Sequence, residues 1–389
     1  MFSLIEKFYS SSPAKRLLTV VTWLLILAAA STAYSFINFF TIFNREMNRE
    51  RKPENAIGFE KLPLGMYLND RTKAALTSWI TLKHLSEKLL KESPKAINSF
   101  VLDDSIASYD AQIIETIKSF NGLAWEQLSL FASSQLDPFE NSLPENFRKI
   151  RNAARFLGLY HARFKELYPV ENSAFIFEAS LKLARMTDFS CPFLIGKLIA
   201  IAVDKIALKA VHQFLEAGKL TVEETAQCTS AVNLSLELDR SIAMNFDNEF
   251  ILFKFSYAFT FHRNAPLATW LLNTIFGDPI VVYQHLSKEL LNVTDSNLVD
   301  QAIRHPVLKL GFPNFGKALL NYSKNLAMKA ILMSELKAST GQATPVRDPF
   351  SCHPLKSLSR NGKQVYYSVG PDNADNKMQG DDITFFAND

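Results

Sequence analysis

The chain has 389 residues and is 48% hydrophobic and 21% charged, so it can bury a sizeable core and does not have the composition of a disordered protein. With 31 phenylalanines and only 13 glycines, it favours helices over short strands joined by frequent turns. The net charge of +3 and the scattered lysines and arginines argue against a nucleic-acid partner. The 3 cysteines are far apart and predict no disulfide framework or metal site, so we expect Cys191 and Cys228 to be small buried side chains.

Residues 17–43 read LLTVVTWLLILAAASTAYSFINFFTIF, a run without a charged side chain. A helix crosses the hydrocarbon core in about 20 apolar residues, so this run predicts a transmembrane helix, followed by a juxtamembrane linker at residues 44–59. The alternative is a cleaved signal peptide, with an apolar region of about 7–15 residues and a small-residue cleavage site. Here residues 28–31 (AAAS) are followed by more apolar chain, which favours a retained anchor. Basic residues on the two sides nearly balance, so charge alone does not give the orientation.

Residues 60–312 carry apolar side chains at helical spacing and are predicted to form an irregular bundle of about ten helices, with antiparallel neighbours joined by short loops. Residues 221–224 (TVEE) have the pattern of a capping box, which predicts the start of a helix. Pro266, Pro279 and Pro313 are expected in the first turns of helices. The clearest apolar stripes are Trp79, Leu82, Leu85, Leu89 and Leu90 in one helix, and Phe147, Ile150, Ala154, Leu157 and His161 in another that starts near Pro144.

Two further apolar segments are not predicted to span a membrane. Residues 193–210 contain Lys197, Asp204, Lys205 and Lys209, each of which would be costly at bilayer depth, so we expect a buried, amphipathic core helix there. Residues 250–261 are rich in aromatic side chains, but the segment is short and contains Lys254.

The body lacks the motifs of known catalytic sites. Its histidines do not form the HExxH pattern, and there is no GxSxG elbow, phosphate-binding loop or GxGxxG fingerprint. The carboxylate pairs Asp103-Asp104 and Glu223-Glu224 are expected at helix starts, where the helix dipole favours negative charge. We therefore predict a non-enzymatic protein with a role in interaction or assembly. The alternative is a membrane-bound hydrolase with a site built from distant helices, which a cleft with two carboxylates, or with a histidine and polar partners, would favour.

Residues 313–389 are predicted to form a small α/β module. A long amphipathic helix would end at Gly341, and Asn361-Gly362 is a strong hairpin signal before the strand-like residues 364–369. A hard cation such as Ca²⁺ takes about six to eight oxygen ligands, which a bent loop with several carboxylates can supply. A solvated acidic tail is the alternative interpretation. The candidate metal ligands are Asp372, Asp375, Asp381 and Asp382.

The order DPF, PL, YYSVGPD and DDI in residues 348–383 resembles the C-terminal hairpin and calcium-binding loop of the major pseudopilin of type II secretion systems. That family has DPW-G-x-P-Y, then Y-S-x-G-A-D-G, then D-x-D-I. The chain is more similar to uncharacterised bacterial single-pass membrane proteins with the endings DPFSGKPL, YSVGPDGxDDGG and DDI. Their helical bodies also contain a segment similar to residues 194–221. In this chain Cys352-His353 replaces Gly-Lys, and residues 376–378 (NKM) replace a glycine-rich stretch.

The resemblance implies a mainly α fold with an N-terminal transmembrane helix, an irregular helical bundle and a small C-terminal hairpin module. It implies Ca²⁺ as a ligand, with Asp372 matching the first loop aspartate, Asp381 or Asp382 the last, and Asp375 a third. It also implies a bacterial inner membrane, with residues 1–16 in the cytoplasm and the body in the periplasm. The function that it suggests is interaction or assembly at the cell envelope, in connection with secretion, with a protein partner whose identity the sequence does not give.

Overall fold

The described residues of the chain are mainly helical, as predicted. They form seven α-helices, two short 3-10 helices and one antiparallel hairpin, all within one compact unit. The structure is a computed structural model that describes residues 70–92, 104–128, 143–191, 193–242, 245–246, 274, 315–342, 346–360 and 362–385. The helices are α4 (Asp70–Glu92), α6 (Asp110–Asn121), α8 (Leu143–Leu167), α9 (Ala174–Ser190), α10 (Leu194–Glu216), α11 (Val222–Glu237) and α17 (Phe315–Ser339), with the 3-10 helices η1 (Asp104–Tyr109) and η2 (Trp125–Gln127).

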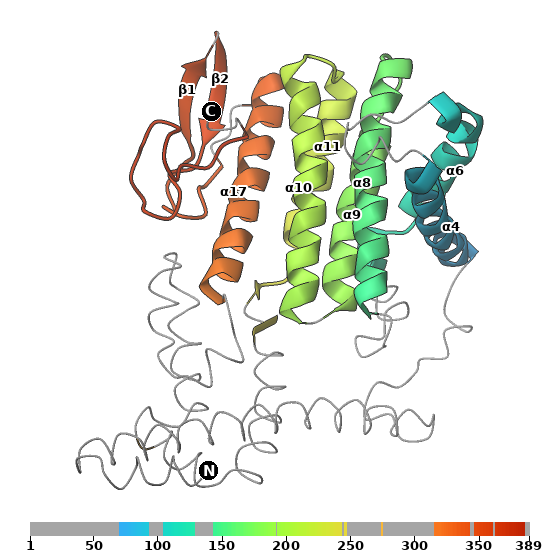
Figure 1. Ribbon diagram of the computed structural model, residues 1–389. Helices are drawn as coiled ribbons and strands as arrows, with labels where there is room; N and C mark the ends of the chain where they lie inside the picture. Colours follow the sequence, from blue (N-terminus) through green and yellow to red (C-terminus); the bar gives the residue numbers. More distant parts are fainter. Residues whose placement is uncertain are drawn as a thin grey trace, which may run out of the picture. The chain divides into compact units, whose positions relative to one another are not determined.

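Five of the helices pack in two layers (Figure 1). Helices α8, α10 and α17 lie side by side in one layer, with α10 in the middle, and α9 and α11 pack behind them. The three helices of the first layer run in the same direction, whereas α9 and α11 run in the opposite one. Helices α4 and α6 pack together and flank α8 and α9. From α8 to α11, consecutive helices therefore alternate in direction across short connections, as the sequence predicted.

The helix starts and core positions predicted from the sequence are confirmed where the structure describes them. Helix α10 covers the predicted core helix at residues 193–210 and packs against α8, α9 and α17. Helix α11 begins with the predicted capping box, in which Thr221 and Glu224 each accept a hydrogen bond from the other's backbone N–H. Cys191 and Cys228 are buried and form no disulfide, as expected. The predicted stripes supply buried side chains from α4 (Trp79, Leu82, Leu85 and Leu89) and α8 (Phe147, Ile150, Ala154, Leu157 and His161).

The C-terminal module is a two-stranded hairpin. Strands β1 (Lys356–Arg360) and β2 (Lys363–Tyr367) pair in antiparallel register, with Arg360 opposite Lys363. The two strands therefore reverse direction between Arg360 and Lys363, where the Asn361-Gly362 signal predicted a hairpin turn, and Gly362 has a positive φ of 76°. The paired strand ends at Tyr367, before the predicted end at residue 369, and Ser368 forms an isolated bridge with Ile383 instead.

The module is fixed to the helices by apolar and polar contacts. The ring of Phe385 stacks on His212 of α10, with the ring centroids 4.3 Å apart. The Lys363 amino group donates to the backbone carbonyl of Glu216 at the end of α10, at 2.8 Å. An apolar cluster joins α17 to the module through Ala327, Ala330, Ile331, Phe350, Leu355 and Ile383. The hairpin is therefore held against α10 and α17, as Figure 1 shows for α17.

Several predictions concern residues outside the described ranges. These are the transmembrane helix at residues 17–43, the linker at 44–59, the aromatic segment at 250–261 and the helix starts at Pro266, Pro279 and Pro313. Among the helices that the structure does describe, none is both long enough and apolar enough for a membrane span.

Candidate functional site

The four aspartates predicted as calcium ligands lie in the loop that follows β2, and two of them come together there. The backbone N–H of Asp372 donates to Oδ2 of Asp381 at 3.2 Å. The side-chain amide of Asn376 donates to both carboxylates, at 3.3 Å to Asp372 and 3.2 Å to Asp381. The carboxylates of Asp372 and Asp381 are thus gathered around one amide group.

The other two aspartates of the loop have separate partners. The Tyr367 hydroxyl donates to Asp375 at 2.8 Å, and this hydrogen bond lowers the pKa of Asp375. Asp382 is buried and accepts a hydrogen bond from the N–H of Met378 at 2.7 Å. Burial raises the pKa of Asp382, and its Oδ1 atom has no hydrogen-bond partner in the described part of the chain.

The loop as it stands is not a complete metal site. Within the described residues, no three side chains of histidine, cysteine, aspartate and glutamate are grouped closely enough for a metal ion. Calcium binding therefore requires the carboxylates of the loop to move together, which would bring the unpartnered oxygen of Asp382 into use. The calcium site stays a prediction.

The turns of the module have an unusual backbone for their residues. Four residues other than glycine adopt left-handed φ angles, which cost a side-chain-bearing residue about 1–2 kcal/mol each. Gly370 also has a positive φ of 71°, and a Cβ atom there would lie 2.3 Å from the carbonyl oxygen of Asp381, so only glycine fits. The four residues are Cys352 (φ 59°), Asn373 (56°), Lys377 (54°) and Met378 (68°).

Asp348, the first residue of the DPF motif, organises the start of the module. Its buried carboxylate accepts hydrogen bonds from the Ser368 hydroxyl at 2.8 Å, the Val369 N–H at 3.0 Å and the Phe350 N–H at 2.9 Å. The turn that begins the module is thereby fixed to the end of β2. The motif was visible in the sequence, but this role was not predicted, because the partners are about twenty residues away along the chain.

A second group of charged residues, which the sequence analysis did not predict, is buried where α9, α10, α17 and the end of α11 meet. Arg185 contacts Asp204 at 2.6 Å and Asp239 at 2.5 Å. Lys197 contacts Asp188 at 2.8 Å and Asp239 at 2.5 Å, and Lys329 contacts Asp204 at 2.8 Å. No side chain of the six is more than 4% exposed. The buried ion cluster comprises Arg185, Lys197, Lys329, Asp188, Asp204 and Asp239.

Mutual pairing keeps charges in this cluster despite burial. Burial alone would raise the pKa of Asp239, but Arg185, Lys329 and Lys197 outweigh it and hold this pKa well below its usual range. Burial likewise disfavours the charged form of Arg185, but Asp204 and Asp239 more than compensate and raise its pKa. Because three cations face three carboxylates, the charges cancel, and the cluster joins helices instead of presenting a net charge to a ligand.

A smaller buried network contains a histidine, a serine and a glutamate, residue types that also occur in catalytic triads. The His161 ring lies 3.0 Å from the Ser173 hydroxyl, which donates to Glu224 at 2.9 Å, and Glu224 pairs with Lys165 at 2.6 Å. In a catalytic triad the histidine stands between the other two residues, whereas here the serine does. Burial lowers the pKa of His161 to about 3 and raises that of Cys228, close by, to about 12. The network therefore offers no exposed nucleophile and connects α8, α9 and α11.

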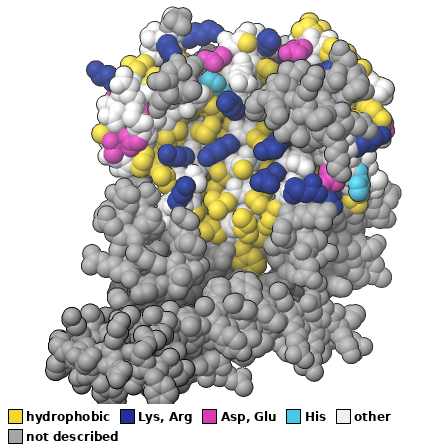
Figure 2. Space-filling model, viewed as in Figure 1, with side chains coloured by type: hydrophobic (Ala, Val, Ile, Leu, Met, Phe, Trp, Pro, Cys, Tyr) yellow, Lys and Arg dark blue, Asp and Glu magenta, His cyan; other side chains and the backbone are white. Residues whose placement is uncertain are grey.

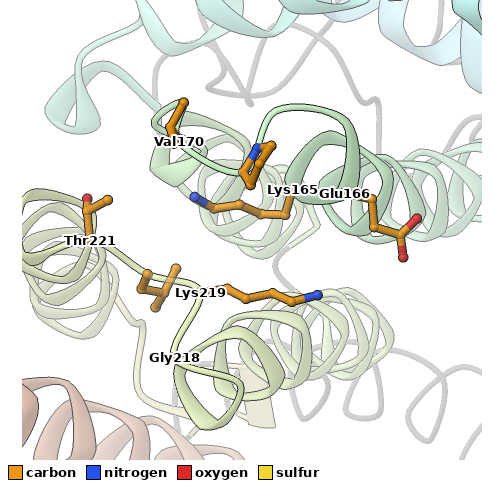
Figure 3. Close-up of a pocket in the computed structure, with 8 residues that line it drawn as sticks. Lys165, Glu166, Val170, Gly218, Lys219 and Thr221 are labelled. Carbon is orange, nitrogen blue, oxygen red and sulfur yellow. The ribbon is translucent and has the colours of Figure 1, made fainter.

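A pocket of about 500 Å³ lies beside this network, between the end of α8 and the connection from α10 to α11. Figure 3 shows that the amino groups of Lys165 and Lys219 point in opposite directions and that the carboxylate of Glu166 is turned away from Lys165. Since the Lys165 amino group is already paired with Glu224, the pocket presents no convergent set of acid and base groups.

Comparisons with known proteins gave no match: no protein-family model, no curated protein and no solved structure is similar to the chain. The candidate site therefore rests on its own geometry.

If the loop binds calcium, thermal unfolding of the full chain in detergent should shift to higher temperature with calcium and back with chelator. A cation that bound only the folded loop would stabilise it by about 2.7 kcal/mol at a hundredfold excess over its dissociation constant. Asp372→Ala should abolish the shift, whereas Glu166→Gln, which removes an exposed carboxylate from α8, should retain it. An unchanged midpoint in millimolar calcium would rule out the site.

Asp239→Asn should destabilise the protein by about 3–5 kcal/mol, because it leaves three buried cations with two carboxylates. Glu237→Gln is the matched control on an exposed residue two positions away, and its effect should stay within about 0.5 kcal/mol. Denaturant unfolding monitored by circular dichroism would measure the free energy of unfolding of both variants. An Asp239→Asn variant as stable as Glu237→Gln would contradict a role of the cluster in stability.

The same residue predicts the effect of pH. Since the pKa of Asp239 is depressed in the folded state, its contribution to stability is complete above about pH 4, the pKa of an unfolded aspartate, and is lost as pH falls further. When the pH is lowered below about 4, the free energy of unfolding should therefore fall less for Asp239→Asn than for the parent protein.

Proposed function

We propose that the protein is a membrane-anchored, non-enzymatic protein of the bacterial cell envelope with a role in interaction or assembly. The anchor is residues 17–43, the body is in the periplasm, and the C-terminal module is the part that binds the partner. The observation that carries the interaction role is an exposed strand edge, β1, in that module.

All five residues of β1 are exposed, and β2 is the strand that packs on α17. Counted from the Arg360–Lys363 pair at the turn, the backbone groups of Ser357 and Ser359 face away from β2. No hydrogen bond in the described part of the chain reaches these outward groups. Such an edge can accept an extended segment of another protein as an additional strand. The basic residues Lys356 and Arg360 at its ends, and its short length, would restrict unselective pairing.

The backbone of the module supports the resemblance on which the membrane and envelope assignment rests. In the similar proteins, the pattern DPFSGKPL and YSVGPDGxDDGG has glycine at the positions of Cys352, Asn373, Lys377 and Met378. These are the four described residues other than glycine that have left-handed φ angles. A chain that keeps a glycine conformation without the glycine retains the same turn geometry at a cost in strain. This agreement favours a module shared with those proteins over a chance similarity in sequence.

The contacts of the buried polar groups weigh against the hydrolase alternative. That alternative required a cleft with two carboxylates or with a histidine and polar partners. In the described part of the chain, His161 and His212 both have polar partners, but both rings are buried. The carboxylates of the buried ion cluster are paired with cations. An interaction role needs no such cleft.

The strand edge can be tested with one substitution and its control. Ser359→Pro removes an outward N–H without removing a bond to β2, so the hairpin should still form while a strand added by a partner should not. Ser359→Ala keeps the N–H and should behave like the parent. A photo-crosslinking residue in place of Leu358, which is 37% exposed, should give the same adducts in the parent and the alanine variant and lose them in the proline variant. Adducts that survive in the proline variant would contradict binding at this edge.

The anchor is tested by alkaline carbonate washing of membranes from the native host. The intact chain should remain with the membrane, because residues 17–43 are long enough to span it, and a chain that lacks residues 1–52 should be released. In spheroplasts, added protease should digest the body. Release of a chain shortened by about 30 residues would identify a cleaved signal peptide instead, and protection of the body until lysis would reverse the orientation.

A further inference from the structure

The outer face of the layer formed by α8, α10 and α17 carries many basic side chains. Figure 2 shows lysine and arginine side chains spread across this side of the molecule, with hydrophobic side chains between them. On α10, Lys205 and Lys209 are one turn apart, on the side away from the buried Asp204. The basic face comprises Arg151 and Arg155 of α8, Lys205 and Lys209 of α10, and Lys317 and Lys324 of α17, all exposed or half-buried.

These cations are not used to hold the fold together. None of the six forms an ion pair with a carboxylate among the described residues. The pKa of Lys205 is lowered by partial burial and by the neighbouring charge of Lys324, so two of the helices bring their cations close enough to repel. The described acidic side chains of α8, α10 and α17 lie elsewhere: Asp204 is buried, and Glu166, Glu216 and Glu335 belong to the C-terminal halves of their helices.

Apolar side chains occupy the surface between the cations. Ile195 on α10 is 46% exposed, Ala202 is exposed, and Leu198, Ile206 and Met328 are half-buried. Neighbouring helices approach closely in this face, since a Cβ atom on Gly158 of α8 would lie 2.9 Å from Ile206 of α10. The face therefore combines a continuous helical surface with exposed apolar groups and unpaired cations.

We propose that this basic face docks on the surface of an anionic phospholipid bilayer. Lysine and arginine would contact headgroup phosphates, and the apolar side chains between them would enter the boundary between headgroups and acyl chains. A basic residue near an anionic surface contributes about 1 kcal/mol, so a face with several of them can hold a domain that is already tethered nearby. The tether is the membrane anchor at residues 17–43. The inference rests on the proposed function only in that this anchor would keep the domain near the bilayer.

The chemistry of the face favours lipid over nucleic acid. Single-stranded nucleic acid is bound by aromatic side chains interleaved with cations, whereas the side chains between these cations are aliphatic.

The test uses the full chain with Ala202→Cys, reconstituted in nanodiscs of phosphatidylcholine alone or mixed with phosphatidylglycerol. A water-soluble maleimide is added, and labelling is read for each site by mass spectrometry. The thiol at position 202 should react more slowly in the anionic discs, and high salt should restore its rate. Native Cys352, which is exposed on the module, serves as the internal reference. Its rate of labelling should be the same in both kinds of disc.

Paired charge variants decide whether the cations cause the protection. Lys205→Gln with Lys324→Gln should weaken docking about thirtyfold, from about 1 kcal/mol for each charge, and should not harm the fold, because it removes two charges that repel. Lys118→Gln with Lys219→Gln changes the net charge equally at exposed lysines outside the face and should leave the protection intact.

Two outcomes would overturn the proposal. Equal reactivity at position 202 in both kinds of disc would show that lipid charge does not matter. Protection by an added oligonucleotide, without an effect of lipid, would assign the face to nucleic acid. Failure of the chain to enter discs at all would count against the anchor, which separates that result from a failure of docking.

Discussion

The described fold depends on the buried ion cluster, whose six charged side chains are shielded from water. Helices α9, α10 and α17 and the residues after α11 bring these side chains together. Arg185, Lys197 and Lys329 are each paired with at least one of Asp188, Asp204 and Asp239, and burial makes every missing pair costly. Apolar packing tolerates small slips between helices, but an ion pair at 2.5–2.8 Å does not. The cluster therefore sets the positions of α9, α10 and α17, and of the residues after α11, along one another. We infer that it selects one arrangement among the several that a helical bundle of this composition could adopt.

The same helices use the same residue types for opposite purposes. On α10, Lys197 faces inward and is neutralised, whereas Lys205 and Lys209 face outward without a described carboxylate. On α17, Lys329 is buried in the cluster and Lys324 lies on the basic face. The angle of each residue around its helix decides between the two roles. A nearly neutral chain can for this reason present a strongly basic surface, because its acidic residues are used in the interior or lie at other places.

How much the sequence could predict follows from how local each signal is. Three features were predicted because each depends on residues that are close together in the sequence. They are the capping box at Thr221, the turn before Lys363 and the core stripe of α8. Glu224 was predicted at a helix start, but its pairing with Lys165 was not, because that partner is on another helix. The buried ion cluster and the anchoring of Asp348 depend likewise on residues far apart in the chain. The sequence showed Lys197 and Asp204, together with Lys205 and Lys209, only as charges that argue against a membrane span. It did not predict that two of the four would join a buried ion cluster.

Helix α17 connects the interior, the module and the basic face, because each occupies a different side of it. Asn325 and Lys329 reach Asp204 in the buried ion cluster, Ala327 and Ile331 pack against the module, and Lys317 and Lys324 face outward. A rotation of α17 by one residue, about 100°, would break all three sets of contacts together. The exposed strand β1 and the basic face are thus fixed relative to each other by one helix whose own position the cluster determines. A partner strand added to β1 would meet a module whose orientation to a docked bilayer is already set, so little further ordering would be needed on binding.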